Sequence, residues 1–360
     1  MAVSSPTGIS PLPSAGGGSA TSKHLRSLDG LRAVSIVLVL LDHMGRPWDR
    51  GPLDLGVGNY GQLGVVVFFV ISGFLITSLL LSEHARTGRV SLKLFYARRA
   101  VRIFPAAYVY LACVFVLSRA GWIHVGSKDF WYALTYTVNY DPNPAWQIGH
   151  LWSLSVEEQF YLLWPFAFVA LGLRRAAWVA AAVVLVGPIA RAGAWIFLRG
   201  TPYDDVPMFP MVADSLAIGC LLAIYRNWLE NQRWYVRLLR PDVSALLVAV
   251  VLLLNRYTGY GVVEVLGRSV MNVALALLVH RSVVHSRDLA GRFLNWAPVV
   301  FIGVLSYSFY LWQQIFLDRH SSAWVTDFPQ NLVLSFGAAL ASYYLLEKPL
   351  MALRQRLAAS

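Results

Sequence analysis

The stretch Leu63-Gly-Val-Val-Val-Phe-Phe-Val-Ile-Ser-Gly-Phe-Leu-Ile-Thr-Ser-Leu-Leu-Leu81 contains no charged side chain. As a helix it would be about 28 Å long, close to the hydrocarbon core of a bilayer, which is about 30 Å thick. Over the whole chain of 360 residues, 57% are apolar or aromatic and only 14% are charged. Water-soluble domains of this length do not show that balance. The sequence therefore predicts an integral membrane protein.

Ten mostly apolar stretches predict an all-α, polytopic bundle of ten spans, three of them short. An eleventh candidate, Phe130–Val138, would invert the charge bias of the later loops, so we interpret it as re-entrant or interfacial. The predicted spans are Leu28–Met44, Leu63–Leu81, Pro105–Leu117, Leu154–Leu173, Ala176–Leu198, Pro207–Tyr225, Val243–Leu254, Val262–Val279, Pro298–Leu317 and Leu332–Leu346.

The loop charges predict how the chain threads the membrane, because cytoplasmic loops carry the excess of Lys and Arg. With both termini cytoplasmic, the cytoplasmic segments hold 20 of the 30 Lys and Arg residues and the opposite loops hold 7. The Arg46–Gln62 loop is then extracytoplasmic. The net charge of +11 follows from this topology and does not indicate nucleic-acid binding.

The chain is interpreted as one membrane domain with a tail. Residues 1–22 are rich in Ser, Pro and Gly and predict a disordered cytoplasmic tail, and residues 23–360 form the membrane domain. Cys113 and Cys220 lie in apolar spans, where cysteine packs as a small hydrophobe, so no disulfide framework is predicted.

Charged and titratable groups inside a span are candidates for function because burying them in the membrane is costly. In the first span, Arg32 and His43 are eleven residues apart, which places them on one helix face about 16 Å apart along the axis. A phosphate-rich cofactor held at Arg32 could reach His43 with an extended arm. Alternatively, Arg32 extends to the interface and His43 only packs against, or hydrogen-bonds to, a neighbouring helix.

Arg99 and Arg102 stand three residues apart at the cytoplasmic edge of the third predicted span, and so share a helix face. Two guanidinium groups in that arrangement suit bidentate phosphate binding. The alternative is that they only set the orientation of the chain and contact anionic lipid.

His150 and Glu157 are seven residues apart at the start of the fourth span and also share a face. Glu157 would lie about 10 Å deeper, near the predicted depth of His43. A carboxylate beside an imidazole could orient it for general-base catalysis. Alternatively, Glu157 pairs structurally with a buried arginine such as Arg191 or Arg268.

Six motifs together resemble the acyltransferase 3 family of membrane O-acyltransferases, in the family's order and over almost the whole chain. They are Leu28-Asp-Gly-Leu-Arg-Ala33 with His43 after it, Phe68-Phe-Val-Ile-Ser-Gly-Phe-Leu75, Arg98-Arg-Ala-Val-Arg-Ile-Phe-Pro105, Trp152-Ser-Leu-Ser-Val-Glu-Glu-Gln-Phe-Tyr161, Ser306-Tyr-Ser-Phe-Tyr-Leu-Trp312 and Leu346-Glu-Lys-Pro349.

The resemblance implies transfer of an acyl group, usually acetyl, from acyl-coenzyme A to a hydroxyl of a sugar, glycan, lipid or macrolide-type metabolite, without a metal. It implies a multi-pass protein of a bacterial plasma membrane, surrounded by lipid, and leaves the acceptor, the acyl length and the oligomeric state open. By its motifs, His43 and Glu157 are catalytic, Arg32, Arg99 and Arg102 bind the acyl donor, and His150, Ser72, Tyr310 and Trp312 are candidates for lining the acceptor site.

Two departures from the family pattern concern the acceptor. Gln313 stands where many members have a histidine after Tyr-Leu-Trp, so a role for that histidine in acceptor binding is not expected here. Many relatives also carry a soluble hydrolase-like domain after the last span. Its absence from this sequence counts against lipopolysaccharide or peptidoglycan as the acceptor and leaves stand-alone modification of a small metabolite open.

A transporter or flippase of an acyl donor or glycolipid is the main alternative function, since such proteins also bury charges among many spans. It predicts matching Gly- or Pro-broken spans in the two halves of the chain. No such pair is evident in the sequence. The sequence therefore favours an enzyme.

Overall fold

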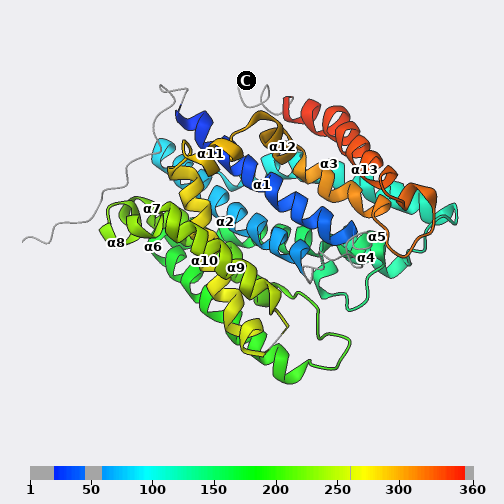
Figure 1. Cartoon of the computed structure of the whole chain (residues 1–360), viewed down its shortest axis with the longest axis horizontal. Helices are drawn as coiled ribbons and strands as arrows, with labels where there is room; N and C mark the ends of the chain where they lie inside the picture. Colours follow the sequence, from blue (N-terminus) through cyan, green and yellow to red (C-terminus); the bar gives the residue numbers. More distant parts are fainter. Residues whose placement is uncertain (1–19, 45–58, 260, 353–360) are drawn as a thin grey trace, which may run out of the picture.

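The computed structural model describes residues 20–44, 59–259 and 261–352, and within these ranges all regular secondary structure is helical (Figure 1). The all-α prediction is thereby confirmed. The helices are α1 Ala20–Met44, α2 Tyr60–Thr87, α3 Leu92–Arg119, α4 Ser127–Leu134, η1 Val138–Tyr140, α5 Trp146–Gly149, α6 Leu151–Phe197, α7 Phe209–Glu230, α8 Arg233–Leu238, α9 Pro241–Arg256, η2 Val263–Gly267, α10 Arg268–Val284, α11 Leu289–Leu294, α12 Ala297–Phe316, η3 Trp324–Thr326, α13 Gln330–Ser342 and η4 Tyr343–Glu347.

Each of the ten predicted spans coincides with helix over most of its length. Six helices in the described ranges are long and apolar enough to cross a membrane by themselves, so the count of ten stays a prediction. These six are Tyr60–Thr87, Leu92–Arg119, Trp146–Phe197, Phe209–Glu230, Val263–Val284 and Ala297–Phe316. The predicted tail lies outside the described residues except for residues 20–22, which are helical and belong to α1.

The long helix α6 contains a break at the end of the fourth predicted span, just before the fifth begins. Gly172 has φ 74° and ψ 163°, which is not a helical conformation. Glycine tolerates positive φ because it has no Cβ atom. The two halves of α6 are therefore two helices joined at Gly172, as the two predicted spans require.

The eleventh candidate span, Phe130–Val138, is not one continuous helix: its first five residues belong to α4, and only Val138 belongs to η1. The eight residues of α4 form a helix about 12 Å long, which is too short to cross a bilayer. The interfacial or re-entrant interpretation of this segment fits the structure.

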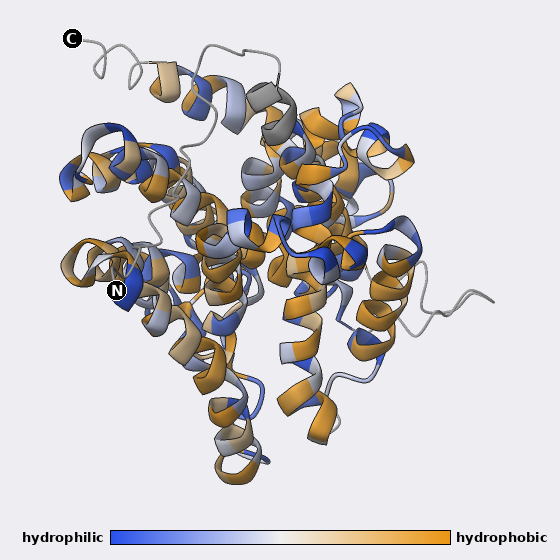
Figure 2. Cartoon of the chain, turned by 90° about the vertical axis from the view of Figure 1, so that its left-hand side faces the viewer, coloured by the Kyte–Doolittle hydropathy of each residue, from blue (hydrophilic) through white to orange (hydrophobic). Residues whose placement is uncertain are grey.

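The second half of α6 presents large apolar side chains outward. Trp178, Leu185, Ile189, Ile196 and Phe197 are each between 67% and 78% exposed. Figure 2 shows that hydrophobic residues colour much of the helical ribbon. A soluble protein rarely exposes an apolar face of this extent, whereas lipid tails cover it without penalty.

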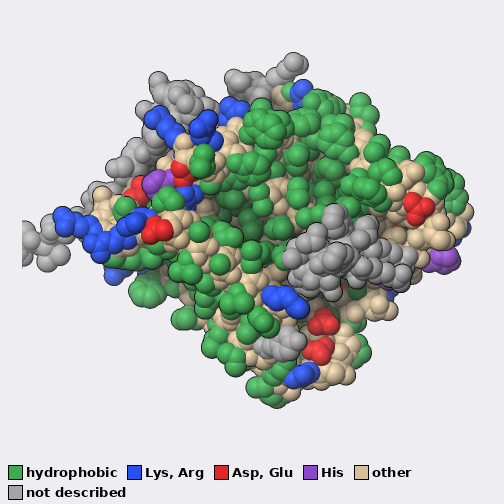
Figure 3. Space-filling model, viewed as in Figure 1, with side chains coloured by type: hydrophobic (Ala, Val, Ile, Leu, Met, Phe, Trp, Pro, Cys, Tyr) green, Lys and Arg blue, Asp and Glu red, His purple; other side chains and the backbone are tan. Residues whose placement is uncertain are grey.

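Many Lys and Arg side chains lie together at one end of the molecule (Figure 3). Figure 3 shows Lys and Arg side chains gathered at the end of the molecule where α8 and α11 lie. These two helices carry Arg233, Arg237 and Arg292. The arrangement fits a cytoplasmic end by the positive-inside rule. That orientation remains a prediction.

α1 packs against both α2 and α12, and α2 packs against α7. Glycines allow these backbones to touch, as small residues often do in membrane bundles. A Cβ atom on Gly303 of α12 would lie 1.8 Å from the carbonyl oxygen of Asp29, and one on Gly73 of α2 would lie 1.9 Å from that of Leu216. The close contact between α1 and α12 brings His43 beside Gln313.

Candidate active site

One cavity, called here the arginine cavity, is lined by the three arginines that the sequence singled out. Arg32 comes from α1, and Arg99 and Arg102 come from one face of α3. Phe68, Ser72, Glu157, Tyr161 and Tyr310 also line it. The spacing of three between Arg99 and Arg102 therefore does place both guanidinium groups at a single site.

Two of the three guanidinium groups lack a carboxylate partner in the part of the chain that the structure describes. Arg32 lies 3.3 Å from Asp29. Among the described residues, no carboxylate oxygen lies within 4.0 Å of Arg99 or Arg102, and Nε of Arg99 is buried without a hydrogen bond. Arg99 instead lies over the ring of Tyr161, 4.0 Å from its centroid. A cavity with unpaired guanidinium groups attracts a phosphate or another anion.

Glu157 lines the arginine cavity and is hydrogen-bonded to another residue that lines it. Its Oε1 accepts a hydrogen bond from Oγ of Ser72 at 2.6 Å, and Tyr161 donates to the same Ser72 hydroxyl at 3.2 Å. Ser72, a candidate from the second motif, thus joins the predicted acidic residue to the cavity wall.

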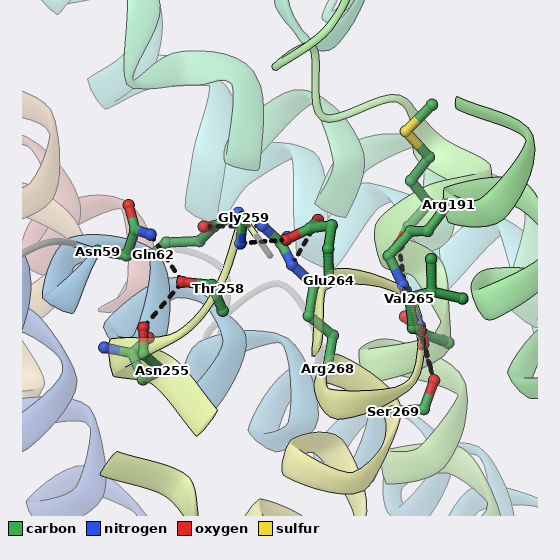
Figure 4. A network of polar contacts seen from close by, with 12 residues as sticks. Asn59, Gln62, Arg191, Asn255, Thr258, Gly259, Glu264, Val265, Arg268 and Ser269 are labelled. Carbon is green, nitrogen blue, oxygen red and sulfur yellow. Dashed lines mark hydrogen bonds and ion pairs between the residues drawn. The ribbon is translucent and has the colours of Figure 1, made fainter. Parts of the chain in front are cut away.

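The structural alternative for Glu157, a pairing with Arg191 or Arg268, does not occur. Arg191 pairs with Asp214 at 2.9 Å, and Arg268 pairs with Glu264 at 2.8 Å. Figure 4 shows these arginines in a separate polar network, in which Arg191 also donates to the carbonyl of Val265 and the hydroxyl of Ser269. These contacts hold the second half of α6, α7 and α10 together.

A second cavity, called here the His43 cavity, has a volume of about 410 Å³. His43, Asp42, His150, Trp152 and Tyr310 are among the residues that line it. Nδ1 of His43 lies 2.9 Å from Oε1 of Gln313, and the imidazole packs edge-on against the indole of Trp146 with ring centroids 5.6 Å apart. His43 is therefore held in place by α12 and α5.

The sequence predicted Glu157 as the residue that orients His43, and the structure gives His43 a different partner. Glu157 bonds to Ser72 in the arginine cavity, whereas Gln313 bonds to Nδ1 of His43. Sequence reasoning noted Gln313 only as a departure from the family pattern and missed Trp146. The signal for Gln313 was present: adjacent buried amides in an apolar span need partners.

His150 also lines the His43 cavity. Its ring lies between those of Tyr110 and Tyr310, with centroids 5.5 Å and 5.3 Å away. Neither ring nitrogen has a hydrogen bond to a described residue. Trp312 packs its ring against Tyr110, at 5.6 Å, and is not among the residues that line either cavity.

The two cavities share a wall. Val65 and Tyr310 line both of them. The Tyr310 hydroxyl donates to the carbonyl of His150 at 2.5 Å and lies 2.6 Å from Oγ of Ser153. These contacts hold the tyrosine between a cavity suited to an anion and a cavity that contains an imidazole.

Comparison with known proteins identifies the family of this chain. Residues 25–347 match the acyltransferase domain that defines the acyltransferase 3 family. The O-acetyltransferase OatA of Staphylococcus aureus (strain NCTC 8325) is 29% identical over 321 residues, which cover 81% of this chain and 50% of the relative. The peptidoglycan O-acetyltransferase OatA of Listeria monocytogenes is 27% identical over 324 residues, with 81% and 49% coverage.

The chain thus spans about half the length of these curated relatives. No solved structure is detectably similar to it. In the described ranges, no group of three or more His, Cys, Asp or Glu side chains is arranged to hold a metal ion. The match to the family covers most of the chain and every motif that contributes to the two cavities, so the chain belongs to the acyltransferase 3 family and carries its acyltransferase domain.

Proposed function

We infer that the protein transfers an acyl group, acetyl in the first place, from a coenzyme A thioester to the hydroxyl of an acceptor. The observation that carries this proposal is the shared wall: the arginine cavity and the His43 cavity meet at Val65 and Tyr310. The arginine cavity would take the phosphates of the donor, and the thioester would reach toward His43.

His43 is the base in this proposal. A hydroxyl is a poor nucleophile at neutral pH, and an imidazole, with an ordinary pKa of about 6.5, can remove its proton as it attacks. The hydroxyl oxygen forms an ester bond with the carbonyl carbon, the carbon–sulfur bond breaks, and the coenzyme A thiolate leaves. The proton held by His43 then passes to the thiolate. Transfer is direct, with no acyl-enzyme intermediate.

The acceptor in this proposal carries several hydroxyls. The His43 cavity is also lined by Asp42, Asp141 and Asp204, whose carboxylates accept hydrogen bonds from hydroxyl groups, and by the indole of Trp152. The Listeria relative is named a peptidoglycan O-acetyltransferase, and peptidoglycan contains sugars. A sugar-bearing acceptor in a bacterial plasma membrane or envelope is the class that we propose.

The test compares metabolites and envelope glycans from cells that produce the wild type or His43→Ala. We expect one species to lose an acyl mass in the variant and the transfer rate to fall by roughly 10² or more, because a general base contributes about that much. The control is His84→Ala, since His84 is exposed at the end of α2, away from both cavities. Substantial transfer by a stably inserted His43→Ala protein would remove His43 from the mechanism and make His150 the next candidate.

A further inference from the structure

Gln313 is a fully buried amide on α12 whose Oε1 lies 2.9 Å from Nδ1 of His43. A neutral imidazole has one N–H group and one bare nitrogen, and the partner of either nitrogen decides which tautomer forms. An amide has a donor end and an acceptor end, so the tautomer of His43 depends on which end of Gln313 faces the ring.

The orientation of the Gln313 side-chain amide is fixed by a series of hydrogen bonds that ends on a backbone carbonyl. A carbonyl oxygen only accepts, so the Gln314 side-chain atom 2.8 Å from the carbonyl of Trp146 is Nε2. Oε1 of Gln314 therefore faces Gln313 and accepts from its Nε2 at 2.8 Å. Oε1 of Gln313 is left to face His43, where it accepts the hydrogen on Nδ1.

Trp146 contacts residues at both ends of this series of hydrogen bonds, Gln314 at one end and His43 at the other. Its indole Nε1 donates to the backbone carbonyl of Gln314 at 3.0 Å, and its ring packs against the imidazole of His43. Gln314 is only 3% exposed, so bulk water does not compete for these hydrogen bonds. Turning either amide around would place two acceptors or two donors against each other, at a cost of about 1–3 kcal/mol for each buried group left unpaired.

We propose that Gln313, oriented by Gln314 and the carbonyl of Trp146, is a positioning residue that keeps the proton of neutral His43 on Nδ1 and leaves Nε2 bare. Nε2 is then the atom that accepts the proton of the attacking hydroxyl. The inference rests on the proposed role of His43 as the base. It gives Gln313, and not Glu157, the task of orienting the imidazole.

The first test observes the tautomer directly and needs no activity. In detergent-solubilised protein with isotope-labelled histidine nitrogens, the signal of His43 is identified by its loss in His43→Gln. At a pH where this imidazole is neutral, the wild type should show hydrogen on Nδ1 and a bare Nε2. Gln313→Leu should shift the population toward the opposite tautomer. A wild-type His43 with its proton on Nε2 would overturn the proposal.

The second test uses a pair of variants matched in size. Gln313→Leu removes the acceptor and should lower kcat by roughly 10- to 100-fold while both KM values stay within about twofold, because a wrong tautomer impairs the chemical step and not binding. Gln313→Glu keeps a carboxyl oxygen that accepts from Nδ1, and its kcat should stay within a few-fold of wild type. Equal kcat values for the two variants would contradict a positioning role.

Gln314→Leu provides a second variant in case the Gln313 substitutions prevent folding. It leaves the contact with His43 in place and removes the nearer of two acceptors for Nε2 of Gln313, at 2.8 Å; the carbonyl of Tyr310, at 3.5 Å, remains. The tautomer signal should therefore become mixed. An unchanged pure Nδ1–H signal in Gln314→Leu would contradict the hydrogen-bond chain. The tautomer test and the activity test can fail independently. If His43→Ala protein is active and wild-type His43 carries its proton on Nδ1, the role of His43 as the base is refuted, but the role of Gln313 in setting the tautomer stands.

Discussion

Arg99 and Arg102 have no carboxylate partner among the described residues, and this indicates that they bind an anion. Both line the arginine cavity without a carboxylate within 4.0 Å among the described residues, whereas the neighbouring Arg98 lies outside the cavity and pairs with Glu83 at 2.9 Å. The same short segment therefore contains two unpaired cations in a cavity and one paired cation at the surface. This contrast provides a matched control.

We expect Arg99→Ala and Arg102→Ala to raise the KM for the acyl donor by about 10-fold or more, since a hydrogen bond to a charged group contributes about 1.5–3 kcal/mol. Arg98→Ala should leave this KM unchanged, because exposed ion pairs contribute little. Donor titration in isolated membranes measures all three. Equal donor KM values in the wild type, Arg99→Ala and Arg102→Ala would reduce the two arginines to a topological role.

The sequence predicted the site residues best where local spacing decides their placement. Helical periodicity was enough to place Arg99 and Arg102 at one site. It did not find the partner of His43, because Gln313 is 270 residues away along the chain and the contact depends on how α1 packs on α12. Nor did it predict that Glu157 would bond to Ser72, since equal depth in the membrane does not specify which side chains meet.

At the scale of elements, the packing of α1 against α12 positions the site. α1 carries Arg32 and His43, and α12 carries Tyr310 and Gln313, so the distance between these two helices sets the geometry of both cavities. The length of the apolar runs predicted that both helices exist. Their contact at Gly303 was not predicted, because a single glycine in an apolar run gives no indication of which helix it faces.

Gly303→Ala should therefore weaken both stability and activity. The added methyl group would meet the carbonyl of Asp29 at 1.8 Å, and overpacking of this kind costs about 1–3 kcal/mol. The control is Gly337→Ala in α13, where a Cβ atom meets nothing within 4 Å and alanine favours the helix by about 1 kcal/mol. Thermal unfolding in detergent should show a lower midpoint only for Gly303→Ala. Equal midpoints would mean that α1 and α12 can separate without cost.

At the scale of the whole molecule, the distribution of cations predicts which end faces the cytoplasm. In a protein with Cys113 and Cys220 replaced by alanine, we expect an impermeant thiol reagent to label Thr201→Cys in intact cells. His285→Cys should react only after permeabilisation. Both side chains are exposed, Thr201 between α6 and α7 and His285 between α10 and α11. Labelling of His285→Cys from outside would reverse the orientation.

The wall formed by Val65 and Tyr310 also has an electrical consequence. In the predicted orientation, the arginine cavity faces the cytoplasm and the His43 cavity faces the opposite side, so a charge that passed from one cavity to the other would move through part of the membrane voltage. Each elementary charge that crosses 100 mV gains or loses about 2.3 kcal/mol. Tyr310, whose hydroxyl is held by His150 and Ser153, stands where the exchange takes place. The exchange carries no net charge across the wall, because the acyl group passes to the acceptor while the hydroxyl proton passes in the other direction to the thiolate, so the voltage should leave the equilibrium of transfer unchanged.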